Sequence, residues 1–318
     1  MNWKLRLMWN TRSRILQKGL WAFFFLASLG LQAQDDLLSE LEEESKPATE
    51  YTFATFKGTK VVNLQTNEMP GKGVLQYNIL HRFGAFNQDF LYNFLGLDNA
   101  QVRLTLEYSP TEWFNFGVGH TGVNKVYDGF VKYRLLRQSK GEKNMPVSVT
   151  GFSSLYYSAL RFNDDLPRNT SDRFSFVHEL VIARKFSQNF SLEAVPTLVH
   201  FNLVETRADN NTIFAMGLAG RYKFTPLHAI TVEYVHQLNP NSYSVPGSDD
   251  QNTYTNALSV GVDIETGGHV FQLFVTNAAG VAEPYVFARN QGSWADGDLH
   301  FGFNISRVFT LQKPKQAP

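Results

Sequence analysis

Twelve segments in which apolar and polar residues alternate follow one another through this chain. In "VRLTLEY" (102–108) every second residue is apolar, and Arg103, Thr105 and Glu107 lie between. Successive side chains of a β-strand point to opposite faces, so each segment predicts a strand with one apolar and one polar face. A membrane-spanning strand needs about 9–11 residues, against about 5–6 in an ordinary strand. These segments, of about 9–16 residues, are 72–83, 98–108, 113–121, 125–137, 146–158, 172–186, 189–204, 212–225, 228–239, 253–266, 268–277 and 297–311.

The links between these segments are sorted by length. Short links at 109–112, 138–145, 187–188, 225–228 and 266–268 alternate with long ones at 84–98, 159–171, 240–252 and 278–296, with 122–124 and 204–210 as exceptions. Antiparallel strands put alternate links at opposite ends, and outer-membrane barrels have short periplasmic turns and long extracellular loops. We therefore expect an all-β fold, a single antiparallel transmembrane β-barrel of about twelve strands.

In such a barrel the apolar face meets lipid and the polar face lines the interior. Bulky inward residues, Phe130, Phe152 and Phe274, predict a narrow or interrupted path, and Pro196, which lacks an N–H, predicts a bulge or kink. Trp113 and Trp294 fit aromatic girdles at the two membrane surfaces. The expected lumen-lining residues carry both signs of charge: Arg103, Glu107, Asp128, Lys132, Arg134, Glu179, Arg221, Lys223, Glu233, Asp263 and Glu265.

Residues 1–33 resemble a secretory signal, with a basic start, a 12-residue apolar core at 20–31 and a small residue, Ala33, at the cleavage point. An uncleaved anchor is the alternative. We expect a cleaved signal peptide and a protein of the outer membrane of a Gram-negative bacterium. Residues 34–58 form an acidic periplasmic leader, and residues 59–318 form the barrel. Removing 1–33 leaves a net charge of −5, of which −6 lies in 34–50.

Two stretches leave alternatives open. Residues 59–73, "TKVVNLQTNEMPGKG", precede the first strand and fit a thirteenth strand, a lumen plug or a periplasmic lead-in. An even strand count favours the last two. The loop at 86–97 is unusually apolar, so it folds back into the barrel mouth, contacts a partner or dips into the membrane.

Sequence motifs for catalysis or metal binding are absent. The chain has no cysteine, and "HEL" at His178–Glu179 lacks the second histidine of a zinc-protease helix. There is no nucleophile elbow, P-loop or dinucleotide fingerprint, and no basic stripe for nucleic acid. We expect no cofactor, no metal and no catalytic residues. An enzyme at the barrel rim would have to draw on Asp164, Asp165, Asp249, Asp250, Asp296, Asp298 and His120.

Three stretches carry a family resemblance: "FKGTKVVNLQTNEMPGKGVLQYNILHRFG" (56–84), "VYDGFVKYRLLRQ" (126–138) and "FGFNISRVFTL" (301–311). Through them the chain resembles domain-of-unknown-function family 5777, barrels from Bacteroidota, over about residues 52–311. The resemblance implies an outer-membrane β-barrel without an established activity. It supplies no catalytic or ligand-binding residues.

The mixed-charge interior favours a small-solute channel or a ligand-binding barrel. A non-conducting scaffold of an envelope complex and a rim-located enzyme are the alternatives. Expected partners are outer-membrane lipid, the barrel-assembly machinery that reads the last strand (300–309), and an envelope protein that binds the acidic leader.

Overall fold

The structure, a computed structural model, describes residues 48–87, 94–161, 169–244, 251–266 and 269–312. The expected signal peptide and residues 34–47 of the leader lie outside these ranges. The chain divides into a barrel unit, Tyr51–Lys140 with Asn144–Pro318, and a small unit formed by Met1–Glu50 and Gly141–Lys143. All strands of the closed sheet belong to the barrel unit.

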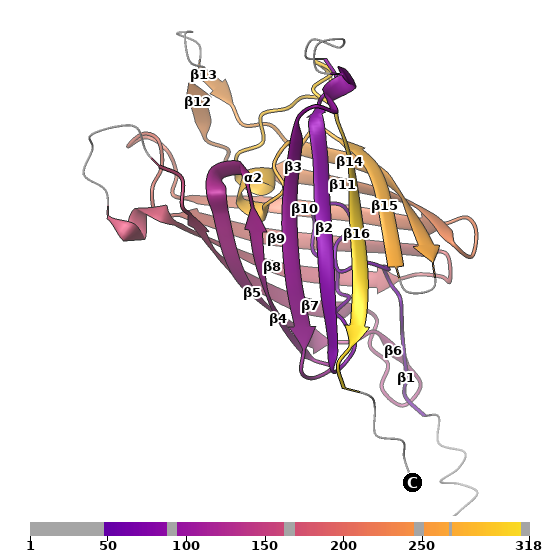
Figure 1. Cartoon of the computed structure of the whole chain (residues 1–318). Helices are drawn as coiled ribbons and strands as arrows, with labels where there is room; N and C mark the ends of the chain where they lie inside the picture. Colours follow the sequence, from indigo (N-terminus) through magenta and orange to yellow (C-terminus); the bar gives the residue numbers. More distant parts are fainter. Residues whose placement is uncertain (1–47, 88–93, 162–168, 245–250, 267–268, 313–318) are drawn as a thin grey trace, which may run out of the picture. The chain divides into compact units, whose positions relative to one another are not determined.

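Twelve antiparallel strands close into one barrel, so the predicted fold class is confirmed (Figure 1). Each strand falls within or close to one predicted segment. The closing pair joins the last strand to the first, with Ile305 opposite Ile79. In chain order the strands are β2 (Val74–Ala85), β3 (Ala100–Ser109), β4 (Phe114–Thr121), β5 (Val126–Leu136), β7 (Ser148–Ser158), β8 (Phe174–Lys185), β9 (Phe190–Phe201), β10 (Thr212–Lys223), β11 (His228–Gln237), β14 (Ala257–Thr266), β15 (His269–Thr276) and β16 (His300–Thr310).

The other elements are short. Helix α2 (Glu283–Ala288) lies in the connection between β15 and β16, and three 3₁₀ turns are η1 (Phe94–Gly96), η2 (Val123–Lys125) and η3 (Thr170–Arg173). No helix among the described residues is long and apolar enough to cross a membrane. Strands outside the barrel sheet are β1 (Glu50–Tyr51), β6 (Ser139–Lys140) and the pair β12 (Ser242–Ser244) and β13 (Gln251–Thr253).

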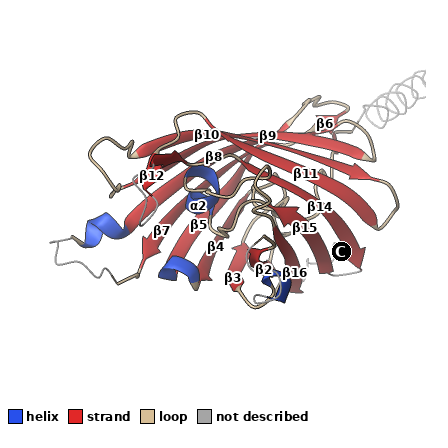
Figure 2. Cartoon of the chain, turned by 90° about the horizontal axis from the view of Figure 1, so that it is seen from above, coloured by secondary structure: helices blue, strands red, loops and turns tan. Residues whose placement is uncertain are grey.

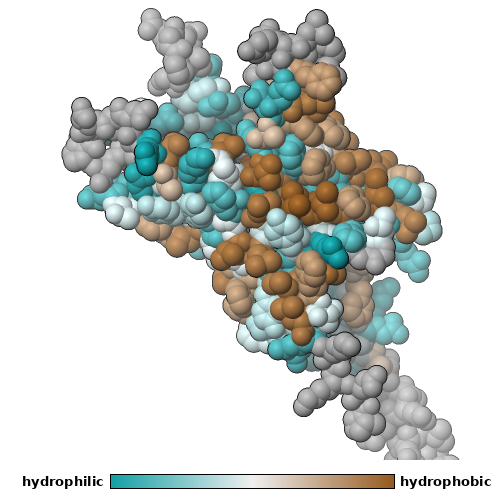
Figure 3. Space-filling model, in the orientation of Figure 1, coloured by the Kyte–Doolittle hydropathy of each residue, from teal (hydrophilic) through white to brown (hydrophobic). Residues whose placement is uncertain are grey.

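The two faces of each strand differ as the alternation predicts. In β3, Leu104 and Leu106 are 40% and 42% exposed, whereas Arg103 and Glu107 are 1% and 3% exposed. Figure 3 shows apolar side chains gathered over the outer face that carries β2, β3 and β16. The charged row therefore points into the barrel and the apolar row points outward.

The expectation of a bulge at Pro196 is wrong. Strand β9 runs unbroken, and its register with β8 is the same on both sides of the proline, with Glu179 opposite Thr197 and Ile182 opposite Ala194. The missing N–H is accommodated by a lapse in the pairing with β8 instead of a shift in register.

The barrel interior is occupied by residues 55–67, which we call the plug. Its side chains are almost all buried, and its one bridge, between Lys60 and Gln65, joins the plug to itself. Of the three alternatives for this stretch, the structure shows the lumen plug. The plug begins at Thr55, inside the range expected for the leader.

A second insertion enters from the long-loop end. The connection between β15 and β16, residues 277–299, carries α2 into the ring of strands (Figure 2). We call it the α2 loop. Its residues Val286 and Phe287 are 1% and 0% exposed and belong to the same apolar cluster as Leu64 of the plug. Two chain segments, the plug and the α2 loop, thus lie inside the barrel.

The apolar loop at 86–97 is described only in part. Residues 88–93 lie outside the described ranges. Phe94 and Leu97 are 62% and 38% exposed, and Gly96 packs against the backbone of Gly84 at the end of β2. These described residues do not fold back into the barrel mouth.

Candidate functional site

The structure places the eleven expected lumen residues on the inner face or at its edge. Three of them, Arg134, Lys223 and Glu265, are partly exposed. Arg134 donates to the backbone oxygen of Glu112 near the short-turn end. The remaining eight are buried: Arg103, Glu107, Asp128, Lys132, Glu179, Arg221, Glu233 and Asp263.

Glu233 of β11 forms the tightest attachment between wall and plug. Its Oε2 accepts the backbone N–H groups of Val62, Asn63 and Leu64 at 3.0, 2.8 and 2.9 Å. Its Oε1 accepts the side-chain amide of Asn63 at 2.7 Å. From the opposite side, Arg82 of β2 donates to Asn63 Oδ1 at 2.9 Å. Hydrogen bonds to a charged acceptor are stronger than neutral ones, so this turn of the plug is firmly held.

Lys132 and Glu107 both bind the plug at Thr59, and Lys132 also binds Glu68, the residue that follows the plug. Lys132 Nζ donates to the backbone oxygens of Glu68 and Thr59, at 2.8 and 3.3 Å. Glu107 Oε1 accepts the hydroxyl of Thr59 at 2.9 Å. The wall charges therefore satisfy backbone groups that a strand-free segment leaves unpaired.

Glu283 anchors the α2 loop inside the barrel. Its carboxylate contacts Arg103 and Lys60, both at 2.5 Å, and accepts the hydroxyl of Tyr156 at 2.6 Å. Arg103 also pairs with Asp128 at 2.8 Å. Burial alone would raise the pKa of Glu283, but the charges of Arg103 and Lys60 hold this pKa well below its ordinary value. One buried carboxylate thus joins loop, plug and wall.

The other side of the lumen is apolar, which corrects the expectation of a polar interior all round. Leu64 of the plug packs against Gly217 of β10, where a Cβ would overlap the Leu64 side chain. This inner surface of β8, β9 and β10 we call the apolar arc. It consists of Val177, Val181, Val195, Val199, Phe201, Ile213, Ala215 and Ala219.

The three bulky inward aromatic residues are buried in the wall. Phe130 and Phe152 are 5.5 Å apart between ring centroids, and the guanidinium of Arg82 lies 4.2 Å above the ring of Phe274. Phe130 covers Gly117 and Phe274 covers Gly302, positions where any Cβ would overlap the ring. Phe130 and Phe274 thus lie against the inner surface of the wall, and the centre of the barrel is occupied by the plug and the α2 loop.

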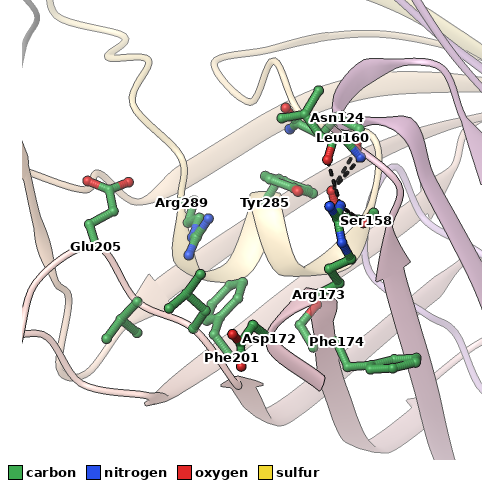
Figure 4. A pocket seen from close by; sticks show the side chains of 13 residues that line it. Asn124, Ser158, Leu160, Asp172, Arg173, Phe174, Phe201, Glu205, Tyr285 and Arg289 are labelled. Atoms are coloured by element: carbon green, nitrogen blue, oxygen red, sulfur yellow. Dashed lines mark hydrogen bonds between the residues drawn. The ribbon is translucent and has the colours of Figure 1, made fainter. Parts of the chain in front are cut away.

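Two cavities lie at the long-loop end, one of about 570 Å³ and one of about 360 Å³. Both are lined by Asn124, Glu205, Tyr285 and Arg289, and we call the two together the vestibule. Figure 4 shows Tyr285 and Arg289 of the α2 loop beside Phe201, the last residue of β9. The floor of the vestibule is therefore the upper end of the apolar arc.

Arg289 is the most available cation in the vestibule. Its guanidinium lies 4.2 Å above the ring of Phe201, and it forms no hydrogen bond or ion pair with any described residue. Glu205 accepts the hydroxyl of Tyr254 at 3.3 Å. Burial and the negative charge of Glu205 raise the pKa of Tyr254 to about 12, so this phenol stays protonated. Sequence reasoning missed Arg289, because the α2 loop has no periodic pattern.

The described residues proposed for a rim enzyme do not assemble into a site. His120 is on the outer face, with its ring 4.3 Å from that of Tyr127. Asp298 accepts the side-chain amide of Asn87 at 2.7 Å, and Asp296 is exposed. Asp164, Asp165, Asp249 and Asp250 lie outside the described residues. Within the described ranges, no group of three or more His, Asp or Glu side chains is arranged to hold a metal ion.

Two solved structures share a barrel fold with this chain and have low sequence identity to it. The NanC porin structure matches with a TM-score of 0.46 and 7% identity, over 74% of this chain and 98% of that one. The COG4313 outer membrane channel from Pseudomonas putida F1 matches with a TM-score of 0.47 and 13% identity, over 76% and 97%. No curated protein is significantly similar in sequence.

The family comparison covers most of the chain. The model of the membrane bound beta barrel domain (DUF5777) matches residues 56–309, from the second residue of the plug to the penultimate residue of β16. This range agrees with the stretches that carry the resemblance in the sequence. The chain therefore belongs to the DUF5777 family of membrane-bound β-barrels.

Proposed function

We propose that this protein is an outer-membrane channel for small amphipathic solutes, which its own plug closes. The observation that supports a channel is the way the lumen is filled. A segment that belongs to none of the twelve strands, residues 55–67, occupies the centre. A barrel whose lumen is filled by a segment has a path when that segment moves.

The contacts of the plug suit reversible closure. Glu233, Lys132 and Glu107 bind plug groups through hydrogen bonds, which water can replace when the segment leaves. The exposed wall would then carry five positive and six negative candidate lumen residues. Near-balanced charges give weak ion selectivity, so recognition of the solute falls to the vestibule.

The class of solute follows from the vestibule and the apolar arc. The larger cavity, about 570 Å³, has the size of a small-molecule site. Arg289 offers unused N–H donors to an acidic or polar head. Below it, Phe201 begins the apolar arc, which suits an apolar body. A molecule with both parts fits this surface better than a fully polar one.

The location and orientation belong to the same proposal. The family is membrane-bound, and the sequence carries an expected secretory signal at 1–33. Short turns at one end and long loops at the other support an orientation with the vestibule on the outer side of the membrane. Solute would therefore meet Arg289 before it meets the plug.

The test replaces residues 55–67 by a Gly/Ser segment of equal length, and the control replaces the exposed loop residues 206–210 in the same way. Folding is checked by the shift in gel mobility between unheated and heated samples. In planar bilayers the plug variant should conduct steadily, whereas wild type and control should stay closed. A folded plug variant that neither conducts nor passes small solutes into liposomes would rule out the channel.

A further inference from the structure

One seam of the barrel wall is interrupted at mid-strand without a change of register, whereas the irregularities of β16–β2 and β5–β7 are register shifts. Between β8 and β9, both fully described, pairing stops after Glu179 and Thr197 and resumes at Ile182 and Ala194. The register leaves Leu180 opposite Pro196 and Val181 opposite Val195, and neither pair belongs to the ladder. Seams on either side are continuous: Gly151 pairs with Leu180, and Met216 with Pro196.

The interruption is built into the sequence. Pro196 has no N–H, so it cannot donate a ladder hydrogen bond to β8 in any register, although its carbonyl can still accept one. Residue 196 lies midway along β9, at the depth of the hydrocarbon core when the strand spans the membrane. Unpaired backbone groups are unfavourable in hydrocarbon, and a closed barrel normally pairs them all. At Pro196, one hydrogen bond of the β8–β9 ladder is therefore missing near the middle of the membrane.

A cavity of about 400 Å³ lies on the outer surface at the same seam. Outward residues Tyr133, His178 and Phe214 line it, together with Pro196 itself. Tyr133 lies flat across Gly151, where a Cβ would overlap its ring. Phe152, Glu179 and Thr197 also belong to the lining, although their side chains are buried on the lumen side. The cavity therefore lies directly over the backbone of the interrupted seam.

The inner side of the seam joins the apolar arc. Val195 and Val181 lie at the interruption, and Val199 leads from there to Phe201 in the vestibule. Beside them, both oxygens of Glu179 are buried and have no hydrogen-bond partner among the described residues. Glu179 faces the lumen beside the backbone of Gln65 in the plug, so the inner side of the seam carries one acidic group among apolar ones.

We infer that the β8–β9 seam at Pro196 is a lateral outlet, through which an apolar solute passes from the apolar arc into the membrane. The inference deepens the proposed channel, because it gives the route and restricts the cargo to molecules with an apolar body. Solute reaching Phe201 would follow Val199 and Val195 to the seam, where it passes Thr197 and Glu179. When β8 separates from β9, the bonds of the β8–β9 ladder around Pro196 break, and the β7–β8 and β9–β10 ladders stay intact.

The test uses single cysteines, because the chain has none of its own. Val195→Cys lies at the seam, and Val235→Cys lies on the lumen side of the continuous β10–β11 seam. Both valines are 0% exposed and belong to one apolar cluster. The full-length barrel in liposomes, with its plug in place, is treated with an N-alkyl maleimide that partitions into the bilayer, and separately with a charged maleimide.

If the outlet opens, the alkyl maleimide should label residue 195 at least ten times faster than residue 235. The charged maleimide should label neither residue to a large extent. Adding Pro196→Ala, which supplies the missing N–H, should slow labelling at 195 several-fold. Equal rates at the two positions, or no effect of Pro196→Ala, would overturn the outlet. Labelling needs no conductance, so this result is separate from failure of the plug variant to conduct.

Hydrogen exchange of the unmodified barrel gives a second measurement if a cysteine variant does not fold. The amides of Leu180, Ile182 and Ala194, which point into the seam, should exchange faster than those of Leu218 and Tyr234, which are paired with each other across the continuous β10–β11 seam. Slow exchange at all three seam amides, equal to that of the paired residues, would contradict a seam that opens.

Discussion

The carboxylate of Glu233, on the barrel wall, accepts both the backbone and the side-chain N–H of Asn63 in the plug, at 2.8 and 2.7 Å. Two further backbone N–H groups, from Val62 and Leu64, point to the same Oε2. A single wall residue therefore satisfies a whole turn of the plug. Release of the plug requires these donors to find water, and the ease of that exchange determines how readily the channel opens.

Glu233→Gln should loosen the plug. Glutamine keeps the size but loses the charge, and its amide hydrogens oppose some of the plug's own N–H groups. Each hydrogen bond to a charged group is worth about 1.5–3 kcal/mol, so plug docking should weaken by at least that amount. Channel openings in planar bilayers should become frequent, and protease should cut within 55–67 sooner.

Glu193→Gln is the matched control for this change. Glu193 is equally buried on the inner face of β9, but neither of its oxygens has a hydrogen-bond partner among the described residues. It does not hold the plug, so its neutralisation should leave conductance and protease sensitivity as in wild type. Equal opening of the two variants would show that lost charge, and not the lost attachment at Asn63, opens the barrel.

Leu64 and Gly217 should be coupled energetically. Leu64→Ala removes a fully buried side chain, with an expected cost of about 2–5 kcal/mol. Gly217→Ala places a methyl group where the Leu64 side chain lies, with a cost of about 1–3 kcal/mol. In the double variant the added methyl enters the vacated space, so the loss should be smaller than the sum. Urea titrations of all three variants measure this coupling, and strict additivity would mean that Leu64 does not pack on Gly217 in the membrane.

Anchoring of the α2 loop should resist moderate acid. Since the pKa of Glu283 is held below its ordinary value of 4.5, the carboxylate stabilises the folded form fully above about pH 4.5. That contribution is lost only as pH falls further, through the lowered pKa. Exchange protection of the α2 amides should thus be the same, after correction for intrinsic rates, at pH 5 and pH 8. Tyr156→Phe removes one donor to Glu283 and should move the acid loss upward.

The alternation predicted the barrel because the period of two is set locally, by which side of a strand each residue occupies. It placed Arg103 and Glu107 inward and Leu104 outward without knowledge of any contact. The plug was one of three alternatives, since its role depends on distant acceptors such as Glu233. The apolar arc was not predicted, because Glu179 led us to expect a charged inner face on this strand, although Val177 and Val181 share that face.

Arg289 should determine the affinity of the vestibule for an acidic head group. Its guanidinium is fixed over Phe201 and has no hydrogen-bond or ion-pair partner among the described residues, so its donors are free for a ligand. A charge-assisted hydrogen bond is worth about 1.5–3 kcal/mol, which corresponds to about a 10- to 100-fold change in Kd. Arg289→Gln should therefore weaken binding of an aromatic carboxylate such as naphthoate by that factor.

The same loss should not appear for naphthalene methanol, the neutral counterpart of that probe, because its contact is with the ring of Phe201 and not with the charge. Arg289→Lys keeps the charge but not the planar stack, so it should recover only part of the carboxylate affinity. Calorimetric titration of the three proteins with the two probes gives the comparison. If Arg289→Gln weakens both probes equally, Arg289 shapes the cavity without recognising the head group.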